Sequence, residues 1–191
     1  NKEDPYHYDQ FIVAAKHFDY ILTTDMLSLP CYHIDAPQSH ASTATFFIQP
    51  KLHFSDSEAP LKRSLFMGTY QRDMHDERTA WQNMVFSAAA PYGLDLVNRH
   101  AENLKNYAFP VFSGDIQYFS SVPYLDTPRL YRHYQQVINV NTITQSPTMF
   151  SRRLIEIMAC GRLAISNRSQ SIKHLFPEMC IEIENTDQAT E

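Results

Sequence analysis

The sequence is poor in glycine, which supplies only four of its 191 residues. None of the four belongs to a G-x-G-x-x-G motif, the turn that binds the pyrophosphate of nicotinamide dinucleotides, or to the G-x-x-x-x-G-K-[ST] motif of P-loop proteins. The sequence therefore supports neither of these nucleotide sites. The G-x-S-x-G elbow, on which many hydrolases carry a serine nucleophile, is missing as well.

Cysteine is also scarce, and its three copies lie far apart, at Cys31, Cys160 and Cys180. No C-x-x-C pair is present, and the nine histidines are scattered without the close spacing of a structural zinc site. We therefore expect reduced thiols, which suit a cytoplasmic protein, and no metal ion.

Long apolar runs and an excess of positive charge are missing too. No run approaches the roughly 20 apolar residues that cross a bilayer, and no signal-peptide pattern opens the chain. The formal net charge of −5 argues against nucleic acid as a partner, because nucleic-acid binders usually carry a basic excess or stripe. A local group of arginines for a small anion is compatible with this charge.

The sequence does contain enough apolar residues, 43% of the chain, for a folded core. From residue 63 onward, short apolar runs alternate with helix-like stretches, which predicts βαβ units and a parallel sheet. Strands are expected at residues 64–67, 94–97, 109–112, 137–140, 163–166 and 179–183. Helices are expected to begin near Asp76, Thr127 and Ser151, and a shorter one to cover residues 172–176.

The first sixty residues differ from the rest. Strands are expected at residues 20–24 and 46–48, and residues 56–60 are typical of a linker. We therefore expect residues 1–60 to be the tail of a preceding domain with its linker, and residues 61–191 to form a Rossmann-like α/β domain. A single continuous domain is the alternative.

The most informative stretch is the predicted helix that begins at Ser151 and ends at Gly161. Its interior is nearly all apolar, so most of its sides should be buried. Arg152 and Arg153 nevertheless lie in its first turn, where the helix dipole is already positive and a cation costs about 0.3–1 kcal/mol. A diphosphate held by the free N–H groups, the Ser151 hydroxyl and an arginine would reverse this cost.

Glu156 lies one turn deeper in the same helix. A carboxylate in an apolar helix needs partners, and a pair of sugar hydroxyls suits its two oxygens. The spacing therefore predicts a phosphate at the tip of the helix and a ribose beside its first turn. The alternative is structural: Arg153 pairs with a carboxylate elsewhere, or with Glu156 one turn away.

The run MFSRRLIEIMACG at residues 149–161 resembles the signature of the CgeB-like, spore-maturation-type glycosyltransferases. These are similar to the larger group of GT-B enzymes, which consist of two Rossmann domains and whose donor half carries a Glu-containing helix that ends in Ala-Cys-Gly. Further segments that resemble the family follow the family's order: 18–25, 29–32, 64–70, 77–78, 118–131, 138–141, 163–166 and 174–176.

The resemblance implies transfer of a sugar from a nucleoside-diphosphate donor to an acceptor, which is a glycan, a protein or a lipid-linked molecule. It implies no cofactor, since the nucleotide sugar is a substrate, and it implies that the chain carries mainly the donor-binding half. The candidate donor-binding residues are Gly68, Tyr70, Arg78, Tyr118, Ser151, Arg153 and Glu156.

Each candidate has an expected role. The loop at Gly68 and the start of the Ser151 helix with Arg153 would face the phosphates, and Glu156 would hold the ribose. Tyr118, or the nearby main chain around Ile116, would meet the base. An alternative stays open for Gly68, which also suits an ordinary turn.

Arg78 is either a phosphate ligand or a solvated helix residue. Three tyrosines are expected to be exposed, and so available to a sugar: Tyr70, Tyr118 and Tyr131.

The sequence departs from the family at Thr148, where many retaining GT-B enzymes carry a second glutamate. The stereochemical outcome is therefore not inherited, and no catalytic residue is identified, because the base of inverting relatives comes from the acceptor domain. We expect metal-independent chemistry in which helix N–H groups and arginine stabilise the leaving diphosphate. Two other functions remain open: a non-catalytic nucleotide-binding or interaction module, and a nucleotide-sugar epimerase of GT-B-like fold.

Overall fold

The computed structural model describes residues 5–70, 75–102 and 107–190. The chain divides into two compact units, each built from separate stretches of sequence. The first unit comprises Asn1–Phe47, Ile143–Phe150 and Ser169–Pro177. The second unit comprises Ile48–Thr142, Ser151–Arg168 and Glu178–Glu191. All the residues predicted for the donor site therefore belong to the second unit.

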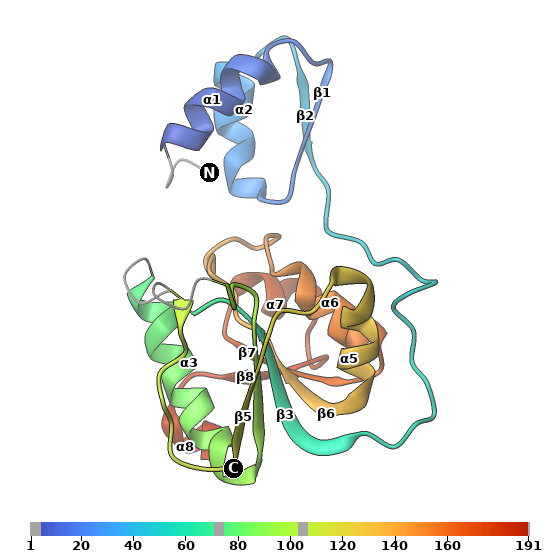
Figure 1. The fold of residues 1–191 in the computed structure, drawn as a ribbon. Coiled ribbons are helices and arrows are strands. Elements are labelled where there is room, and N and C mark those ends of the chain that lie inside the picture. The colour runs from blue at the N-terminus through green and yellow to red at the C-terminus, as the bar shows by residue number, and fades with distance from the viewer. Residues whose placement is uncertain (1–4, 71–74, 103–106, 191) are drawn as a thin grey trace. The chain divides into compact units, whose positions relative to one another are not determined.

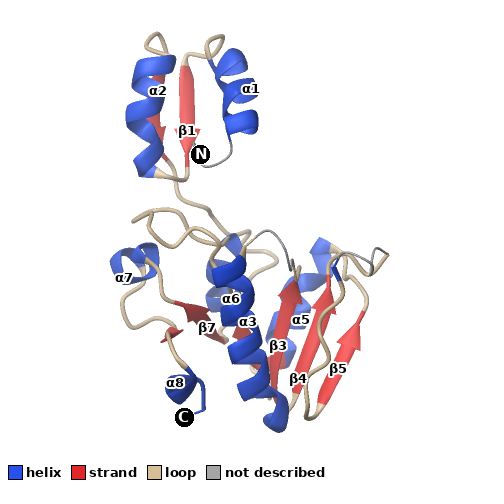
Figure 2. Ribbon diagram, turned by 90° about the vertical axis from the view of Figure 1, so that its left-hand side faces the viewer, coloured by secondary structure: helices blue, strands red, loops and turns tan. Residues whose placement is uncertain are grey.

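The first unit pairs two short strands and covers them with helices. Its elements are α1 (Pro5–Ala15), β1 (Tyr20–Thr23), η1 (Met26–Ser28), α2 (Leu29–Asp35), β2 (His40–Thr43) and α7 (Gln170–Leu175). The two strands are parallel, with Tyr20 opposite His40. Helices α1 and α2 pack against them (Figure 2). The buried core residues are Tyr8, Ala15, Ile21, Tyr32, Ala36 and Ala41.

The side chain of Asp25 joins two stretches of the first unit. Its carboxylate caps η1 by accepting hydrogen bonds from Leu27 N (3.0 Å) and from the Ser28 hydroxyl (3.1 Å). It also accepts a hydrogen bond of 2.6 Å from the Ser146 hydroxyl. The segment 143–150 is thereby attached to the loop that follows β1.

The second unit is a six-stranded sheet with helices on both faces (Figure 1). In spatial order its strands are β5 (Ile116–Phe119), β4 (Leu94–Asn98), β3 (Leu61–Gly68), β6 (Tyr134–Ile138), β7 (Leu163–Asn167) and β8 (Ile181–Ile183). Every neighbouring pair is parallel. The helices are α3 (Asp76–Ala89), η2 (Ala90–Tyr92), η3 (Tyr124–Asp126), α5 (Thr127–His133), α6 (Arg152–Ala159) and α8 (Thr186–Thr190). The predicted Rossmann-like parallel α/β sheet is confirmed.

The core of this unit lies on both sides of the sheet, which is why the central strands read as continuous apolar runs. Helices α3 and α8 lie on one face and α5 and α6 on the other (Figure 1). On the first face, Trp81 and Phe86 of α3 pack with Phe66 of β3. On the second face, Leu154 and Ile157 of α6 are fully buried.

Two of the predicted strands are absent from the structure, and one observed strand was not predicted. The run 109–112, predicted as a strand, is irregular: Phe109 and Phe112 pack against the core, and Pro110 cannot donate to a strand ladder. The edge strand is instead β5, whose mostly exposed side chains gave little apolar signal. The run 46–48 is also irregular, and the strand β2 is a short segment around Ser42.

A cluster of charged and polar groups links the strands of the second unit. Arg63 of β3 binds Asp95 of β4 at 2.6 Å and also pairs with Asp115. The Tyr134 hydroxyl of β6 donates a hydrogen bond of 2.6 Å to the other Asp95 oxygen. Burial, together with this hydrogen bond, raises the pKa of Tyr134 well above its usual value. The buried carboxylate of Asp95 therefore joins three neighbouring strands.

Replacing Tyr134 by Phe should destabilise the second unit, because one buried oxygen of Asp95 loses its donor. We expect the free energy of unfolding at neutral pH to fall by about 1–3 kcal/mol. The raised pKa stabilises the fold below about pH 10, the ordinary value for tyrosine, and this contribution is lost as the pH rises further. The gap between wild type and variant should therefore narrow in alkali.

Urea unfolding followed by the fluorescence of Trp81, the single tryptophan, measures both effects. Tyr92→Phe is the matched control, since the Tyr92 side chain is exposed. Equal stability of Tyr134→Phe and wild type at neutral pH would contradict the importance of this hydrogen bond.

Candidate anion and nucleotide site

The order of the strands fixes where a ligand can bind. Strand β3 lies between β4 and β6, so the chain leaves it in one direction and later returns on its other side. In open parallel sheets, ligands bind outside the carboxyl ends of the strands at such a switch point. Here that edge of the second unit carries residues 68–70, which end and follow β3, residues 139–142, which follow β6, and Ser151 at the start of α6.

The first turn of α6 presents hydrogen-bond donors at this edge. Ser151 is its N-cap residue, with an extended backbone, but its hydroxyl makes no capping hydrogen bond. In the described part of the chain, the N–H groups of Arg152 and Arg153 likewise have no acceptor, as expected for a helix start. An anion is the natural partner for such a group of donors.

The side chain of Asn141 sets the position of this helix start. Its Oδ1 accepts a hydrogen bond of 2.7 Å from Ser151 N. Its backbone N–H and C=O both pair with the Asn167 side chain, at 2.7 and 2.9 Å. Asn139 lies two residues earlier and donates a hydrogen bond of 3.0 Å to the Ser166 hydroxyl. This buried network connects the ends of β6 and β7 to the tip of α6.

Gly68 lies against Arg153, which the sequence could not show. A Cβ at this position would lie 3.0 Å from Nη2 of Arg153 and 2.9 Å from Cζ of Phe66. The Arg153 guanidinium in turn lies 5.4 Å from the centre of the Phe66 ring. Glycine is therefore needed here for a close approach of side chains to the backbone.

Arg78 reaches the same region from α3. Its guanidinium donates hydrogen bonds to the Thr69 carbonyl (3.1 Å) and to the Thr142 hydroxyl (3.3 Å). Its Nε is buried and has no hydrogen-bond partner in the described part of the chain. Burial, and then the positive charges of Arg153 and Arg99, lower the pKa of Arg78. The prediction of a solvated helix residue is therefore wrong, because Arg78 is a half-buried cation.

Arg153 experiences the same repulsion. Burial lowers the pKa of Arg153 and Arg99 adds to this effect, while the neighbouring Tyr131 opposes it. Arg99 is a residue that the sequence analysis missed, although a basic residue directly after a buried strand was a usable signal. It follows Asn98, the register partner of Gly68, and its N–H donates a hydrogen bond of 3.0 Å to the Gly68 carbonyl.

Glu156 is buried one turn into α6, and its Oε1 lies close to three side chains. It accepts a hydrogen bond from Tyr124 OH (3.0 Å), forms an ion pair with Arg152 Nε (2.9 Å), and lies 3.8 Å from Nε2 of His53. The Arg152 guanidinium also lies 4.9 Å from the centre of the Tyr124 ring. The structural partner of Glu156 is therefore Arg152, not the Arg153 of the sequence-based alternative.

The other Glu156 oxygen, Oε2, accepts no hydrogen bond from any residue that the structure describes. Burial and the contact with Glu156 raise the pKa of Tyr124, so this tyrosine stays a donor at neutral pH. Tyr124 and His53 were both missed by the sequence analysis. One precedes a predicted helix and the other a predicted linker, and neither carries a local signal.

The two remaining tyrosine candidates lie in different surroundings. Tyr118 is half exposed on the edge strand β5 and lines a hollow of about 350 Å³ at the carboxyl ends of β4 and β5, with Asn98 and Phe109. Tyr70 is buried in the core, and its hydroxyl donates a hydrogen bond of 2.7 Å to Asn83. The prediction of exposed rings is therefore right for Tyr118 and wrong for Tyr70 and Tyr131, which is also buried.

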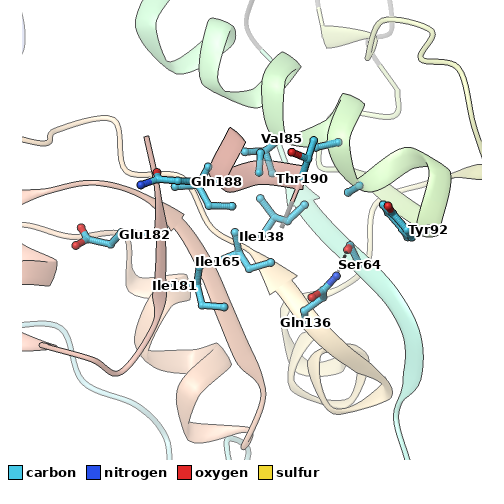
Figure 3. Close-up of a pocket in the computed structure, with 14 residues that line it drawn as sticks. Ser64, Val85, Tyr92, Gln136, Ile138, Ile165, Ile181, Glu182, Gln188 and Thr190 are labelled. Carbon is cyan, nitrogen blue, oxygen red and sulfur yellow. Dashed lines mark hydrogen bonds between the residues drawn. The ribbon is translucent and has the colours of Figure 1, made fainter. Parts of the chain in front are cut away.

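A second pocket, of about 700 Å³, lies between the sheet, α3 and α8 (Figure 3). Its walls are mostly apolar, as at Val85, Ile138 and Ile165, and the Gln136 amide donates a hydrogen bond of 2.6 Å to the Ser64 hydroxyl at its edge. None of the predicted donor-site residues lines it. We therefore place the candidate site at the carboxyl edge, where the cations are.

Two searches of the described residues complete the picture. They contain no group of three or more His, Cys, Asp or Glu side chains arranged to hold a metal ion. None of the helices in the ranges 5–70, 75–102 and 107–190 has the length and apolar composition of a membrane span.

The fold is shared with a solved structure, the sucrose-phosphate synthase of Thermosynechococcus elongatus. The TM-score is 0.59 at 14% sequence identity, and the match covers 98% of this chain and 51% of that chain. At this identity the likeness shows the fold alone, which is that of the GT-B group. The chain spans about half the length of its structural neighbour. No curated protein matches the sequence.

The class is thus an α/β protein with a Rossmann-like sheet of the GT-B kind. The chain belongs to the glycosyl transferase-like family, whose match spans residues 92–190, just over half of the sequence. The matched part includes α6 with Arg153 and Glu156 but not Gly68 or Arg78.

Pyrophosphate should bind this cluster and stabilise the chain. Because neither Arg78 nor Arg153 forms an ion pair with a carboxylate in the described structure, we expect about 1 mM pyrophosphate to raise the melting temperature by about 4 °C. Arg78→Gln should abolish most of this shift, whereas Arg129→Gln, at an exposed arginine of α5, should retain it. Differential scanning fluorimetry at constant ionic strength measures the shift. The same shift in both variants would mean that pyrophosphate binds elsewhere.

Proposed function

We propose that the chain forms the donor site of a glycosyltransferase, which moves a sugar from a nucleoside-diphosphate donor to an acceptor. The observation that supports this best is the placement of Arg78 and Arg153 beside Gly68 and the free N–H groups of α6. Two half-buried cations without a carboxylate partner of their own call for an anion. A diphosphate supplies enough charge and enough acceptor oxygens for all of these donors.

The same donors have a role in catalysis. Cleavage of the bond between sugar and diphosphate leaves negative charge on the departing phosphate. N–H groups and arginines that are fixed before the reaction stabilise this charge without any reorganisation during it. This chemistry requires no cofactor, and we propose that it is metal-independent.

Glu156 is proposed to hold the ribose. Its Oε1 is occupied by Tyr124 and Arg152, and its Oε2 accepts no hydrogen bond in the described structure. An ionised carboxylate oxygen accepts hydrogen bonds only, and the ribose hydroxyls are donors of the required kind. The carboxylate lies one turn from the phosphate-facing N–H groups of α6, as a nucleotide requires.

The remaining candidates have weaker roles in this proposal. The hollow beside Tyr118 is large enough for a planar base, and the exposed tyrosine ring provides a surface for stacking. Tyr70 supports the loop after β3 from inside the core, through its bond to Asn83, and is no longer proposed to contact the sugar.

We further propose that the protein is related to the CgeB-like, spore-maturation-type glycosyltransferases and acts on a glycan, a protein or a lipid-linked acceptor in the cytoplasm. The support is the motif of residues 149–161, which forms a helix that begins after the N-cap position Ser151 and ends at Gly161 with φ +70°. The position of the retaining glutamate is held by Thr148, whose hydroxyl donates a hydrogen bond of 2.9 Å to the Thr24 carbonyl.

Calorimetric titration with UDP and with GDP, in the absence of metal, tests the donor site. We expect one of the two nucleotides to bind, and Arg153→Gln and Glu156→Gln each to weaken binding by about tenfold, since each removes a charge-assisted hydrogen bond. The matched controls are Arg129→Gln and Asp187→Asn, at exposed positions of the same unit. A folded chain that binds pyrophosphate but neither nucleotide would exclude the proposed donor.

A further inference from the structure

The segment before β3, residues 52–58, makes specific contacts with α5 and with the end of α6. Residues 56–60 are predicted as a linker, yet the stretch 52–58 is bound to the second unit. Arg132 of α5 donates a hydrogen bond of 3.0 Å to the Leu52 carbonyl and pairs with Asp56 at 2.9 Å. Asp56 also pairs with Arg162, just after α6, at 3.0 Å. The guanidinium of Arg132 lies 4.2 Å from the centre of the Phe54 ring.

These contacts hold His53 inside the unit. The imidazole is buried, and its Nε2 has no hydrogen-bond partner in the described part of the chain. Oε1 of Glu156 lies 3.8 Å from this nitrogen. A buried polar nitrogen without a partner is costly, so its position beside the one buried carboxylate of α6 calls for a functional explanation.

The other ring nitrogen indicates where the proton lies. Nδ1 is 3.3 Å from Gln49 N, a donor, and 3.2 Å from Gln49 O, an acceptor. A neutral imidazole carries one N–H. If Nδ1 accepts from Gln49 N, the proton lies on Nε2 and points toward the negative oxygen of Glu156. The opposite tautomer would direct a lone pair at the carboxylate, so the Nε2–H form is favoured.

We infer that His53 is a positioning residue of the donor site: its Nε2–H, with Tyr124 and Arg152, holds Oε1 of Glu156 so that Oε2 is presented to the ribose. This inference rests on the proposed function. His53 does not touch the nucleotide itself. It acts through Glu156, and so it should affect recognition of the ribose hydroxyls and leave the diphosphate site unchanged.

A stability cycle tests the contact without any ligand. We expect His53→Leu to lower the melting temperature by about 4 °C in the wild-type background and by less than about half of that in Glu156→Gln, whose amide carries no charge. Equal losses in both backgrounds would show that His53 and Glu156 are independent, which overturns the inference. His33→Gln, at an exposed histidine of the first unit, is the control and should leave the melting temperature unchanged.

Discrimination between ribose and deoxyribose tests the role. For the nucleotide that binds, UDP or GDP, the wild type should prefer it over its 2′-deoxy form by about tenfold. His53→Leu should reduce this preference to about threefold or less while pyrophosphate binding stays unchanged. His53→Gln should restore the preference, because its side-chain amide can donate from nearly the same position.

The outcomes separate the two proposals. Equal weakening of the nucleotide, its deoxy form and pyrophosphate in His53→Leu would make His53 a structural residue and overturn the inference alone. An unchanged ribose preference in His53→Leu would do the same. A wild-type chain that binds neither UDP nor GDP would contradict the proposed function and the ribose part of this inference together, and the stability cycle would still decide whether His53 holds Glu156.

Discussion

The hydrogen bond from Ser151 N to the side chain of Asn141 determines where α6 begins, and the candidate site depends on it. Asn141 is itself fixed by two hydrogen bonds to Asn167, so the helix start is tied to the ends of two neighbouring strands. A helix displaced by one residue would rotate its side chains by about 100°. Arg153 would then leave Gly68, and Glu156 would leave the pocket formed by its three neighbours.

This hydrogen-bond network fixes a site whose positive charges repel one another. Arg78, Arg99 and Arg153 repel, and burial adds to the cost of the first and the last. Such a cluster persists only where the surrounding structure fixes it, and strained groups of this kind concentrate at functional sites. The apolar pocket between α3 and α8 is larger than the hollow beside Tyr118, but no arginine lines it. Volume alone is therefore a poor guide to the binding site of this domain.

The sequence was sufficient for the central architecture because buried parallel strands and amphipathic helices leave strong periodic signals. The strands around Phe66, Leu96 and Val137 and the helix that begins after Ser151 were predicted in the right places, although the strands around Phe66 and Val137 each begin three residues earlier than predicted. The edge strand at Ile116 was missed because its side chains are mostly exposed. Tyr124 and His53 were missed because their importance comes from tertiary contacts, which spacing along the chain does not encode. Arg99 was missed although it directly follows a buried strand. The domain boundary at residue 60 stays a prediction.

The attachment of residues 52–58 to α5 and α6 bears on how this protein can be divided. The first strand of the sheet begins at Leu61, so a truncation based on helices and strands alone would remove the residues before it. A piece cut there would keep every strand and helix of the second unit but would lose Asp56, leaving Arg132 and Arg162 without their shared carboxylate. The contacts that stabilise the second unit therefore extend upstream of its first strand, to Leu52 and, through His53, to Gln49.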